Sequence, residues 1–254
     1  MTDNFQIIVD SGHGGSDNGA SSNGFIEKHL NLQTSLLIES KLKKYFKNVL
    51  MTRIKDVDLS LSQRGAFISR KASEFKGRTI CLSVHFNAFN GVARGAETIY
   101  SIFSKSDLAT SILNSILELG MPKRRVFNRK STRGNFDYYA MHRLTGKAET
   151  VIVEPLFIDN REDQEFLKQV NFLDRLADKY VEGLLKYLNI PLKGEVDMYN
   201  DKDKIAKWAL PSVEKANELG LMIGDNEGNF NPKDGVTREQ LAVALVNLYN
   251  KLKG

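Results

Sequence analysis

The chain has 254 residues, of which 41% are hydrophobic and 26% are charged, a composition typical of a globular domain rather than of a disordered or fibrous chain. Its one cysteine, Cys81, excludes an internal disulfide framework, and its place in an apolar run predicts a buried thiol. No apolar stretch is long enough to cross a bilayer, and the first residues lack the features of a secretory signal. We therefore expect a protein made in the cytoplasm without a signal peptide and with no membrane partner.

The net charge of +5 is unevenly distributed along the chain. From Glu195 onward there are ten acidic and eight basic residues, which leaves 28 basic and 21 acidic residues before it. A basic body indicates a polyanionic environment, either nucleic acid or an anionic polymer of the cell wall. The densest basic cluster, Lys123 to Arg133, lacks regular aromatic interleaving, and no helix-turn-helix or zinc-finger pattern accompanies it. We therefore do not expect nucleic acid as a partner.

Short apolar runs and amphipathic segments alternate along most of the chain. Ile7 to Val9 is typical of a buried strand, and a loop rich in glycine follows it and surrounds His13. Glycines at this density let the backbone turn tightly and approach another group closely. The alternation predicts an α/β layered domain, with strands at 7–9, 48–51, 79–84, 96–102 and 151–153 and helices at 28–44, 59–75, 108–119 and 164–188.

The last part of the chain is organised differently. Residues 189–200 contain a proline, a glycine and several charges without periodicity, so they read as a linker. Two amphipathic helices, at 204–219 and 238–252, are separated by a segment rich in Gly and Asn, and this tail is too short for a large core of its own. We therefore expect a main domain at 1–190, a linker at 191–199 and a small helical module at 200–254 that depends on contacts with other copies or with the main domain.

Four side chains that can bind a metal or transfer a proton stand at the ends of these elements. His13, His85 and Glu154 each follow an apolar strand, and Glu27 lies at or near the start of a helix. Open α/β sheets place their sites at the carboxyl ends of strands. Two imidazoles and a carboxylate suit zinc with a fourth position open for water, and a further carboxylate can take a proton from that water. The residues alone therefore indicate a metallohydrolase.

Each of these residues also has a plain structural interpretation. A histidine after a strand can be structural, Glu27 can favour the positive end of a helix dipole, and Glu154 can be a polar strand terminus. Two further histidines are not expected to bind metal. His29 points away from Glu27 on a helix and is expected at the surface, and His142 is expected in packing or lining a groove.

Taken together, the motifs of residues 5–188 resemble the zinc-dependent N-acetylmuramoyl-L-alanine amidases often called Amidase 3. The resemblance rests on DSGHGG with the following GA, IEKHLNL, LMTR with the later LSQR, SVHFNA, GAETIY and VEPLFIDNREDQEFL. It implies a twisted, mostly parallel sheet with helices on both faces. It also implies roles for individual residues: zinc binding by His13, Glu27 and His85, acid–base catalysis by Glu154, orientation of the histidines by Asp10 and Asn87, and a place near the substrate groove for Arg133.

The tail from about Asn200 resembles one S-layer homology repeat. Trp208, PSVEKANELGLMIGDNEGNFNP and TREQLAVALVNL follow the helix–loop–helix pattern of that module. Such modules bind secondary polymers of Gram-positive walls, usually as three repeats, and here there is one. We therefore expect wall binding, with a helical pair for contacts between chains as the alternative, so that a homo-oligomer is left open.

These resemblances imply a peptidoglycan hydrolase that cleaves the amide between N-acetylmuramic acid and L-alanine. We expect Zn²⁺ as cofactor, with peptidoglycan and a secondary wall polymer as partners. The combination is similar to a phage endolysin, which is made in the cytoplasm and acts at the wall, although a host autolysin is an alternative origin. Two other functions stay open: a zinc peptidase that cuts another bond of the wall peptide, and a wall-binding protein without activity.

Overall fold

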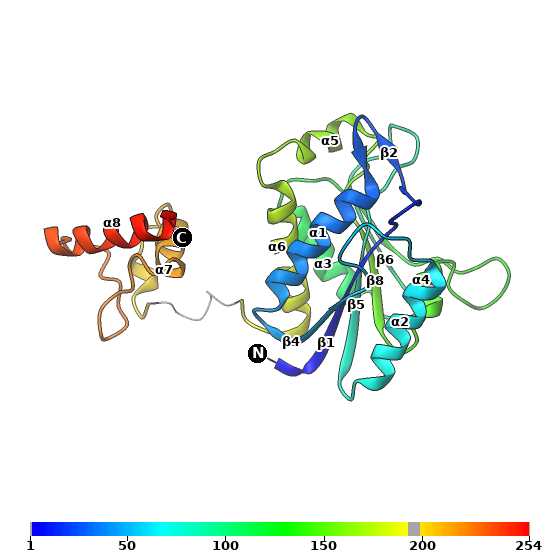
Figure 1. Cartoon of the computed structure of the whole chain (residues 1–254), viewed down its shortest axis with the longest axis horizontal. Helices are drawn as coiled ribbons and strands as arrows, with labels where there is room; N and C mark the ends of the chain where they lie inside the picture. Colours follow the sequence, from blue (N-terminus) through cyan, green and yellow to red (C-terminus); the bar gives the residue numbers. More distant parts are fainter. Residues whose placement is uncertain (1, 193–198, 254) are drawn as a thin grey trace. The chain divides into compact units, whose positions relative to one another are not determined.

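The structure, a computed structural model, describes residues 2–192 and 199–253. The chain divides into two units, Met1–Ile190 and Pro191–Gly254 (Figure 1). The linker expected at 191–199 lies largely outside the described residues, because these leave out 193–198. Within the described ranges, no helix is both long and apolar enough to span a membrane.

In the first unit, the described residues form a six-stranded sheet with the strand order β4-β1-β5-β8-β6-β7. Neighbouring strands run parallel except for β6 and β8, which are antiparallel. The expected α/β fold with a twisted, mostly parallel sheet is therefore confirmed. The strands are β1 (Thr2–Ser11), β4 (Phe46–Met51), β5 (Arg78–Val84), β6 (Ala96–Tyr100), β7 (Lys123–Phe127) and β8 (Glu149–Glu154).

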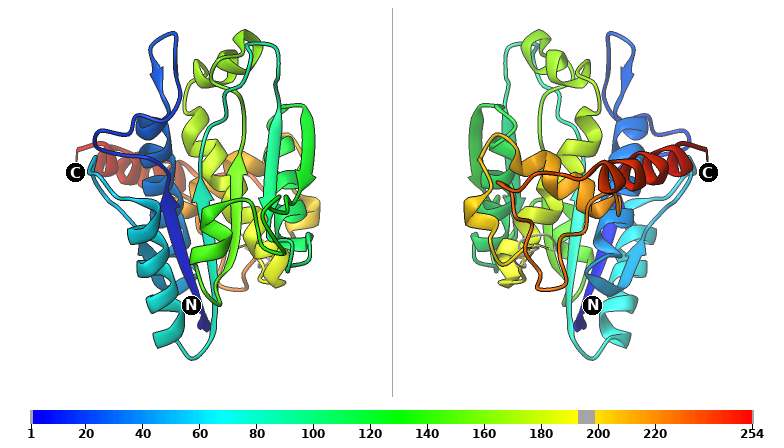
Figure 2. Two further views of the ribbon diagram at one scale, coloured as in Figure 1. Left: turned by 90° about the vertical axis from the view of Figure 1, so that its right-hand side faces the viewer. Right: turned by 90° about the vertical axis from the view of Figure 1, so that its left-hand side faces the viewer.

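Helices cover both faces of this sheet (Figures 1 and 2). Helices α1 (Glu27–Leu42), α3 (Asp107–Leu117) and α6 (Phe172–Leu188) lie on one face, and α2 (Leu61–Glu74) and α4 (Ala140–Leu144) lie on the other. Because the central strands are covered on both sides, they need no polar alternation, and Ile7, Ile8 and Val9 are all fully buried. Helix α5 (Arg161–Leu167) precedes α6, and a hairpin of β2 (Ser21–Ser22) and β3 (Phe25–Ile26) precedes α1.

The first unit differs from the sequence expectation mainly in two places. The helix expected at 164–188 is two helices, α5 and α6, which are separated around Asn171. The backbone there has a φ of +55°, a left-handed conformation that asparagine tolerates and that a continuous helix excludes. The basic segment that we did not expect to be a strand is β7, at the edge of the sheet. Charged side chains on an edge strand hinder its pairing with other chains.

The second unit has a small core and two helices, α7 (Leu210–Glu218) and α8 (Arg238–Lys253), after the 3-10 turn η1 (Lys202–Lys204). Asp201 fixes its loop, because the carboxylate accepts hydrogen bonds from the backbone N–H groups of Phe230 (2.7 Å) and Asn231 (2.9 Å). Helix α7 begins later than the expected residue 204, with Pro211 in its first turn, a position that proline favours. The core consists of side chains that pack on one another: Tyr199, Ile205, Val213 and Phe230.

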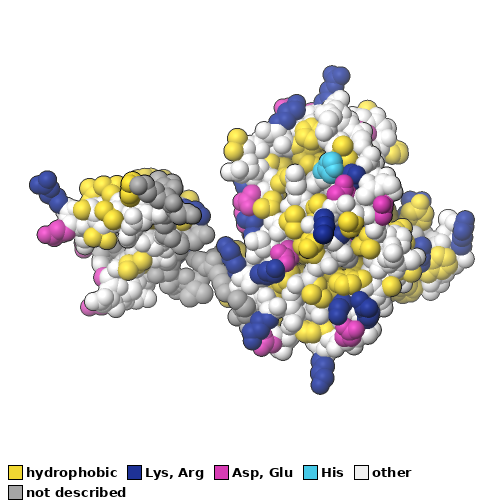
Figure 3. Space-filling view, viewed as in Figure 1, with side chains coloured by type: hydrophobic (Ala, Val, Ile, Leu, Met, Phe, Trp, Pro, Cys, Tyr) yellow, Lys and Arg dark blue, Asp and Glu magenta, His cyan; other side chains and the backbone are white. Residues whose placement is uncertain are grey.

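Apolar side chains gather on the surface of α8 (Figure 3). Leu241, Val243, Leu245 and Val246 have exposed fractions of 49%, 60%, 57% and 56%. A single helix of this length is only marginally stable in water without a packed face. Exposed apolar surface of this kind marks an interaction site, so α8 is suited to contacts beyond the small core of its unit.

Gly183 allows α6 to cross α3 at close range. A Cβ atom at this position would lie 2.6 Å from the Cα atom of Ile112. We predict that Gly183→Val lowers the free energy of unfolding by about 1–3 kcal/mol, because the added methyl groups force the two helices apart. Denaturant unfolding followed by circular dichroism measures the change. Arg175→Val, on the exposed side of α6, is the control with an expected effect within about 0.5 kcal/mol, and equal losses in both variants would contradict the close approach.

Candidate metal centre

Three neighbouring parallel strands, β1, β5 and β8, end side by side at the carboxyl end of the sheet. Gly12, just after β1, donates its backbone N–H to the carbonyl of Val84 at the end of β5 (3.0 Å). His85 in turn donates its backbone N–H to the carbonyl of Val153 in β8 (3.1 Å). These bonds bring the glycine-rich loop after β1, His85 and Glu154 together. This is the end at which open α/β sheets place their sites.

His13, Glu27 and His85 form a compact cluster of candidate metal ligands. One ligand atom of each residue lies within 4.8 Å of those of the other two. Oε1 of Glu27 is 3.2 Å from Nε2 of His13 and 3.0 Å from Nδ1 of His85. Ligand atoms around a tetrahedral zinc ion lie about 3.3 Å apart when the metal–ligand distances are about 2.0–2.1 Å. The donor set and its spacing therefore fit zinc.

Glu27, the first residue of α1, is held on both carboxylate oxygens. Oε2 accepts the backbone N–H of Ala20 (2.9 Å), and Oε1 accepts the backbone N–H of Phe86 and the side-chain amide of Asn31, both at 3.3 Å. Burial alone would raise the pKa of Glu27. Hydrogen bonds and charge attraction from the two histidines outweigh burial and hold this pKa well below its usual range. An ionised carboxylate is therefore available to a metal ion.

His13 is aimed by Asp17, a residue that the sequence interpretation missed. Nδ1 of His13 lies 2.8 Å from Oδ2 of Asp17, and Nε2 faces Glu27. A carboxylate on the far ring nitrogen fixes the orientation and tautomer of a metal-binding histidine. Burial lowers the pKa of His13, but Glu27 and Asp17 raise it more, so the net shift is upward. The available signal was an aspartate four residues after the histidine, inside the same loop.

Two glycines of the loop leave room for the histidine rings. A Cβ atom on Gly12 would lie 2.2 Å from Cε1 of His85, and one on Gly19 would lie 2.7 Å from Cδ2 of His13. His13 itself has a φ of +57°, a left-handed conformation that is uncommon for a residue with a Cβ atom. The shape of the loop is therefore adjusted to the cluster that it carries.

Two buried arginines hold the backbone of this loop. Arg64 on α2 donates to the carbonyls of Ser11 and His13. Arg53 donates to the carbonyls of Ser11 (3.0 Å) and Gly12 (2.9 Å). The two side chains lie in the LMTR and LSQR motifs, to which the sequence interpretation attached no role. Together they donate hydrogen bonds to the backbone carbonyls of Ser11, Gly12 and His13, where β1 passes into the loop.

Asp10 contacts Arg64 instead of a histidine. Its fully buried carboxylate accepts hydrogen bonds from Thr52 Oγ1 (2.7 Å), Ser83 Oγ (2.8 Å) and Arg64 Nη1 (2.9 Å). Within the described part of the chain, these hydrogen bonds take the place of the expected contact with a histidine. Asp10 therefore acts on the candidate metal ligands only indirectly, because it holds Arg64, and Arg64 holds the loop that carries His13.

Glu154 ends β8 and lies directly across from Glu97 on β6. Its Oε2 atom is buried and has no hydrogen-bond partner among the described residues. Burial above all, and then the negative charges of Glu27 and Glu97, raise the pKa of Glu154 well above its usual range. A carboxyl group with a raised pKa and an oxygen that lacks a hydrogen-bond partner is suited to accept and donate a proton at the carboxyl end of the sheet.

The other residues singled out from the sequence lie farther from the cluster or face elsewhere. Asn87 donates from Nδ2 to Oε2 of Glu97 (3.3 Å), so the structure gives it a partner other than the expected histidines. Arg133 is exposed in the loop after β7. His29 is exposed on α1, as expected, and Cys81 is fully buried.

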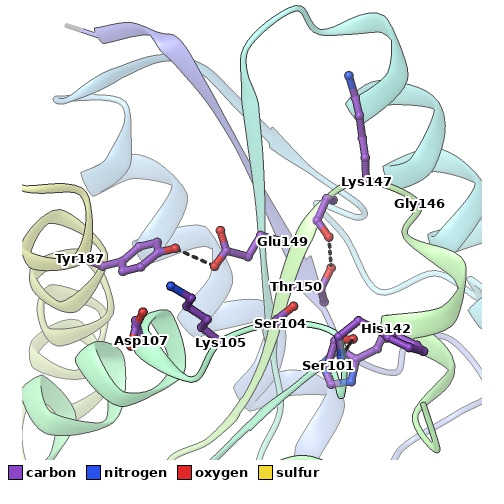
Figure 4. A pocket seen from close by; sticks show the side chains of 12 residues that line it. Ser101, Ser104, Lys105, Asp107, His142, Gly146, Lys147, Glu149, Thr150 and Tyr187 are labelled. Atoms are coloured by element: carbon purple, nitrogen blue, oxygen red, sulfur yellow. Dashed lines mark hydrogen bonds between the residues drawn. The ribbon is translucent and has the colours of Figure 1, made fainter. Parts of the chain in front are cut away.

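A separate polar pocket of about 470 Å³ lies at the opposite end of the sheet (Figure 4). Its lining includes Ser101, which follows β6, and the start of β8, where Glu149 accepts a hydrogen bond from the hydroxyl of Tyr187 (2.7 Å). His142 also lines this pocket, in agreement with the groove-lining alternative, and its ring packs against that of Tyr139. His142 and the candidate metal ligands therefore lie at opposite ends of the sheet.

Comparisons with known proteins identify the family of this chain. The family described as N-acetylmuramoyl-L-alanine amidase matches residues 7–186, and the S-layer homology domain matches residues 199–242. The endolysin of Bacillus phage SPP1 is 31% identical over 232 residues, which cover 89% of this chain and 82% of the relative. The N-acetylmuramoyl-L-alanine amidase CwlM of Bacillus licheniformis is 34% identical over 189 residues, which cover 73% of this chain and 69% of that protein.

A solved structure gives the same result for the fold. The crystal structure of an N-acetylmuramoyl-L-alanine amidase from Clostridium difficile 630 aligns with a TM-score of 0.63 and 25% identity, over 74% of this chain and 98% of that chain. The family match runs from within β1 to within α6 and includes the strand ends that carry the candidate metal ligands and Glu154. The chain belongs to the N-acetylmuramoyl-L-alanine amidase family.

Proposed function

We propose that the first unit, as a catalytic domain, hydrolyses the amide bond between N-acetylmuramic acid and L-alanine with a zinc ion bound by His13, Glu27 and His85. The observation that carries this proposal is the arrangement of the three side chains. Their ligand atoms lie within 4.8 Å of one another, at the carboxyl end of the sheet, where the buried Oε2 atom of Glu154 has no hydrogen-bond partner among the described residues. The family match supports the reaction, and the donor set supports the metal.

The donor set favours zinc over harder metal ions. Two imidazole nitrogens and one carboxylate oxygen are typical zinc ligands, and three protein ligands are the number that a catalytic zinc site uses. A zinc ion held there would supply a Lewis acid that acidifies a water molecule and polarises the amide carbonyl. The low pKa of Glu27 and the carboxylate of Asp17 behind His13 both favour binding of a dication.

We assign the proton transfers to Glu154. An amide nitrogen is a poor leaving group, so it must gain a proton as the C–N bond breaks. The carboxylate form of Glu154 takes a proton from the attacking water at Oε2, and the acid form then gives a proton to the nitrogen of L-alanine. The upward shift of its pKa suits both steps, because a carboxylate with a raised pKa is a stronger base and its acid form persists to higher pH.

Two alternative functions use the same fold. A zinc peptidase would act through the same four side chains but release new amino termini within the wall peptide instead of at L-alanine. A wall-binding protein without activity would have no need for two histidines and two glutamates in this arrangement. The presence of His13, Glu27, His85 and Glu154 together therefore favours an enzyme, and the identity of the released amino terminus separates the amidase from the peptidase.

For the second unit we propose a role in anchoring the enzyme to the cell wall. The S-layer homology match at residues 199–242 supports binding of a secondary wall polymer. The exposed apolar side chains of α8 support association between copies of the chain as the alternative. The similarity to a phage endolysin supports synthesis in the cytoplasm and action at the wall during phage-driven lysis.

Metal removal tests the zinc site. We predict one zinc ion per chain, loss of peptidoglycan hydrolysis on chelation, and recovery of hydrolysis when zinc is added back. His85→Ala removes one of three ligands and leaves substoichiometric zinc, measured by atomic absorption. His29→Ala is the matched control, because His29 is exposed and belongs to none of the contacts of the site, and it keeps the full zinc content. Hydrolysis that persists in metal-free protein would refute the zinc mechanism.

Glu154→Gln tests the acid–base assignment. Glutamine keeps the size of the side chain but cannot exchange the proton, so we predict a fall in kcat of at least about 10²-fold with zinc still bound. New L-alanine amino termini released from purified peptidoglycan give the rate. Glu149→Gln, at the other end of the same strand, is the control and keeps its activity. A Glu154→Gln enzyme of normal activity would transfer the role to another residue.

Removal of residues 191–254 tests the second unit. The first unit forms a compact body on its own, so we predict that residues 1–190 still cleave small soluble muropeptides. Retention on intact cell walls, measured by sedimentation with wall preparations, is expected to fall. Sedimentation velocity of the full chain and of residues 1–190 separates wall anchoring from assembly. Assembly would remain as the function if wall retention were unchanged and truncation lowered the particle mass by more than the removed residues account for, because an oligomer would then have dissociated.

A further inference from the structure

A row of charged side chains leads from Glu154 across the sheet to its edge. Glu154 on β8 pairs with Glu97 on β6, and Glu97 pairs with Arg125 on β7. Side chains of residues that lie directly opposite on neighbouring strands project from the same face of a sheet. Because neighbouring strands are about 4.8 Å apart, the Cα atoms of Glu154 and Arg125 are separated by about 10 Å.

Arg124 joins this row through an irregularity of β7. Ala96 pairs with Lys123, whereas the next residue, Glu97, pairs with Arg125, so Arg124 is an extra residue in the register. A β-bulge of this kind sets two residues of one strand against one residue of its partner. The Nε atoms of both arginines contact Oε1 of Glu97, at 2.9 Å in the case of Arg125.

Both guanidinium groups are held in place by charge and by stacking. Glu97 is only 2% exposed and lies beneath them. The guanidinium carbon of Arg125 is 3.9 Å from the centre of the Phe127 ring, and that of Arg124 is 5.1 Å from the centre of the Phe157 ring. Ordering by a buried carboxylate and an aromatic ring reduces the entropy that each arginine loses when it binds a ligand.

The arrangement leaves positive charge open to solvent. Two guanidinium groups share the one carboxylate of Glu97, so these three side chains carry a net charge of +1. The side chain of Arg124 is 34% exposed and that of Arg125 is 51% exposed. Arg125 already holds Glu97 with one side of its guanidinium, because Nε donates to Oε1 (2.9 Å) and Nη2 to Oε2 (3.4 Å). A ligand carboxylate would meet the other side, where Nη1 and the second N–H of Nη2 can form two parallel hydrogen bonds.

The chemistry of the substrate decides which half of it can meet this charge. The lactyl carboxyl group of N-acetylmuramic acid is consumed in the scissile amide, so the sugar side contributes no carboxylate at the bond. The peptide side ends in a carboxylate and carries more wherever its residues are acidic. A separation of about 10 Å corresponds to about three residues of extended peptide at about 3.3 Å per residue.

We propose that Arg124 and Arg125 bind a carboxylate of the wall peptide about two or three residues beyond the scissile bond, so that the enzyme selects an acidic peptide. This inference rests on the proposed function, because it takes Glu154 as the group beside the scissile bond. Glu97 is then a positioning residue, which holds the two arginines without touching the substrate.

The test uses two soluble muramoyl peptides that differ only in whether the peptide carboxylates are free or amidated. With the zinc-loaded full chain, we expect a KM for the free-acid substrate that is about 10- to 100-fold lower than for the amidated one. Arg125→Gln removes the charged fork and brings the ratio of the two KM values close to one. Arg125→Lys keeps the charge but not the fork and restores part of the ratio.

Arg70→Gln provides the matched control, because it makes the same change of charge at an exposed arginine of α2. This control is expected to keep the ratio of the two KM values. A wild-type enzyme that does not distinguish the substrates, or an Arg125→Gln enzyme that keeps the wild-type ratio, would overturn the proposal. Weaker retention of Arg125→Gln on phosphodiester wall polymer with an unchanged KM ratio would also overturn it, in favour of a polymer site.

A binding measurement separates this inference from the proposed function. Calorimetric titration with the free peptide, as acid and as amide, requires no turnover, and the unfolding temperature of each variant shows that it is folded. Tighter binding of the acid form by the wild-type chain, lost in Arg125→Gln, supports the carboxylate site even in a chain that cleaves neither substrate. Equal binding of acid and amide forms by a chain that does cleave would contradict the site and leave the amidase reaction standing.

Discussion

The hydrogen bonds from two buried arginines to the loop after β1 are the constraint on which the site depends. Arg53 and Arg64 reach the carbonyls of three consecutive residues, the last of β1 and the first two of the loop. Both side chains are at most 3% exposed, and loss of Arg64 would leave the buried carboxylate of Asp10 without its counter-charge. The carboxylate of Asp10 forms an ion pair with the guanidinium of Arg64 (2.9 Å). His13 is thereby held at a positive φ before any metal ion binds, and the ligand set is arranged in advance.

The candidate ligand cluster could be predicted from the sequence because its members lie at or just beyond the ends of regular elements. An apolar run that stops at His85 or at Glu154 gives both the strand and the edge at which the side chain emerges. The groups that orient the cluster carry no such pattern. Asp17 meets His13 only because the loop takes a left-handed turn between them, and Arg64 lies more than 50 positions from the loop carbonyls that it holds. Contacts of that kind are set by tertiary structure, which hydrophobic periodicity does not encode.

The same distinction explains which elements of the fold were predicted. The central strands and α3 are covered by neighbours, and burial imposes the apolar periods from which they were recognised, whereas α1 buries several polar side chains. The first three residues of β7 are all cationic, and this strand pairs with the sheet on one side alone. Its backbone therefore pairs with β6, while two of its basic side chains contact Glu97 and remain partly exposed to solvent. The break at Asn171 depends on one residue whose left-handed φ interrupts an otherwise continuous amphipathic pattern.

Glu154 and Glu97 show how one row of the sheet separates two carboxyl groups by their surroundings. Like charges directly opposite on neighbouring strands destabilise a sheet, and here two arginines match Glu97 while Oε2 of Glu154 has no partner among the described residues. Burial above all, then the charges of Glu27 and Glu97, raise the pKa of Glu154, so the surroundings favour the acid form of Glu154 more than water would. A substrate carboxylate bound at the arginines would bring a further negative charge to this row and favour the protonated form again. Binding of the peptide and protonation of its nitrogen would then be linked electrostatically across β8, β6 and β7, without a conformational change.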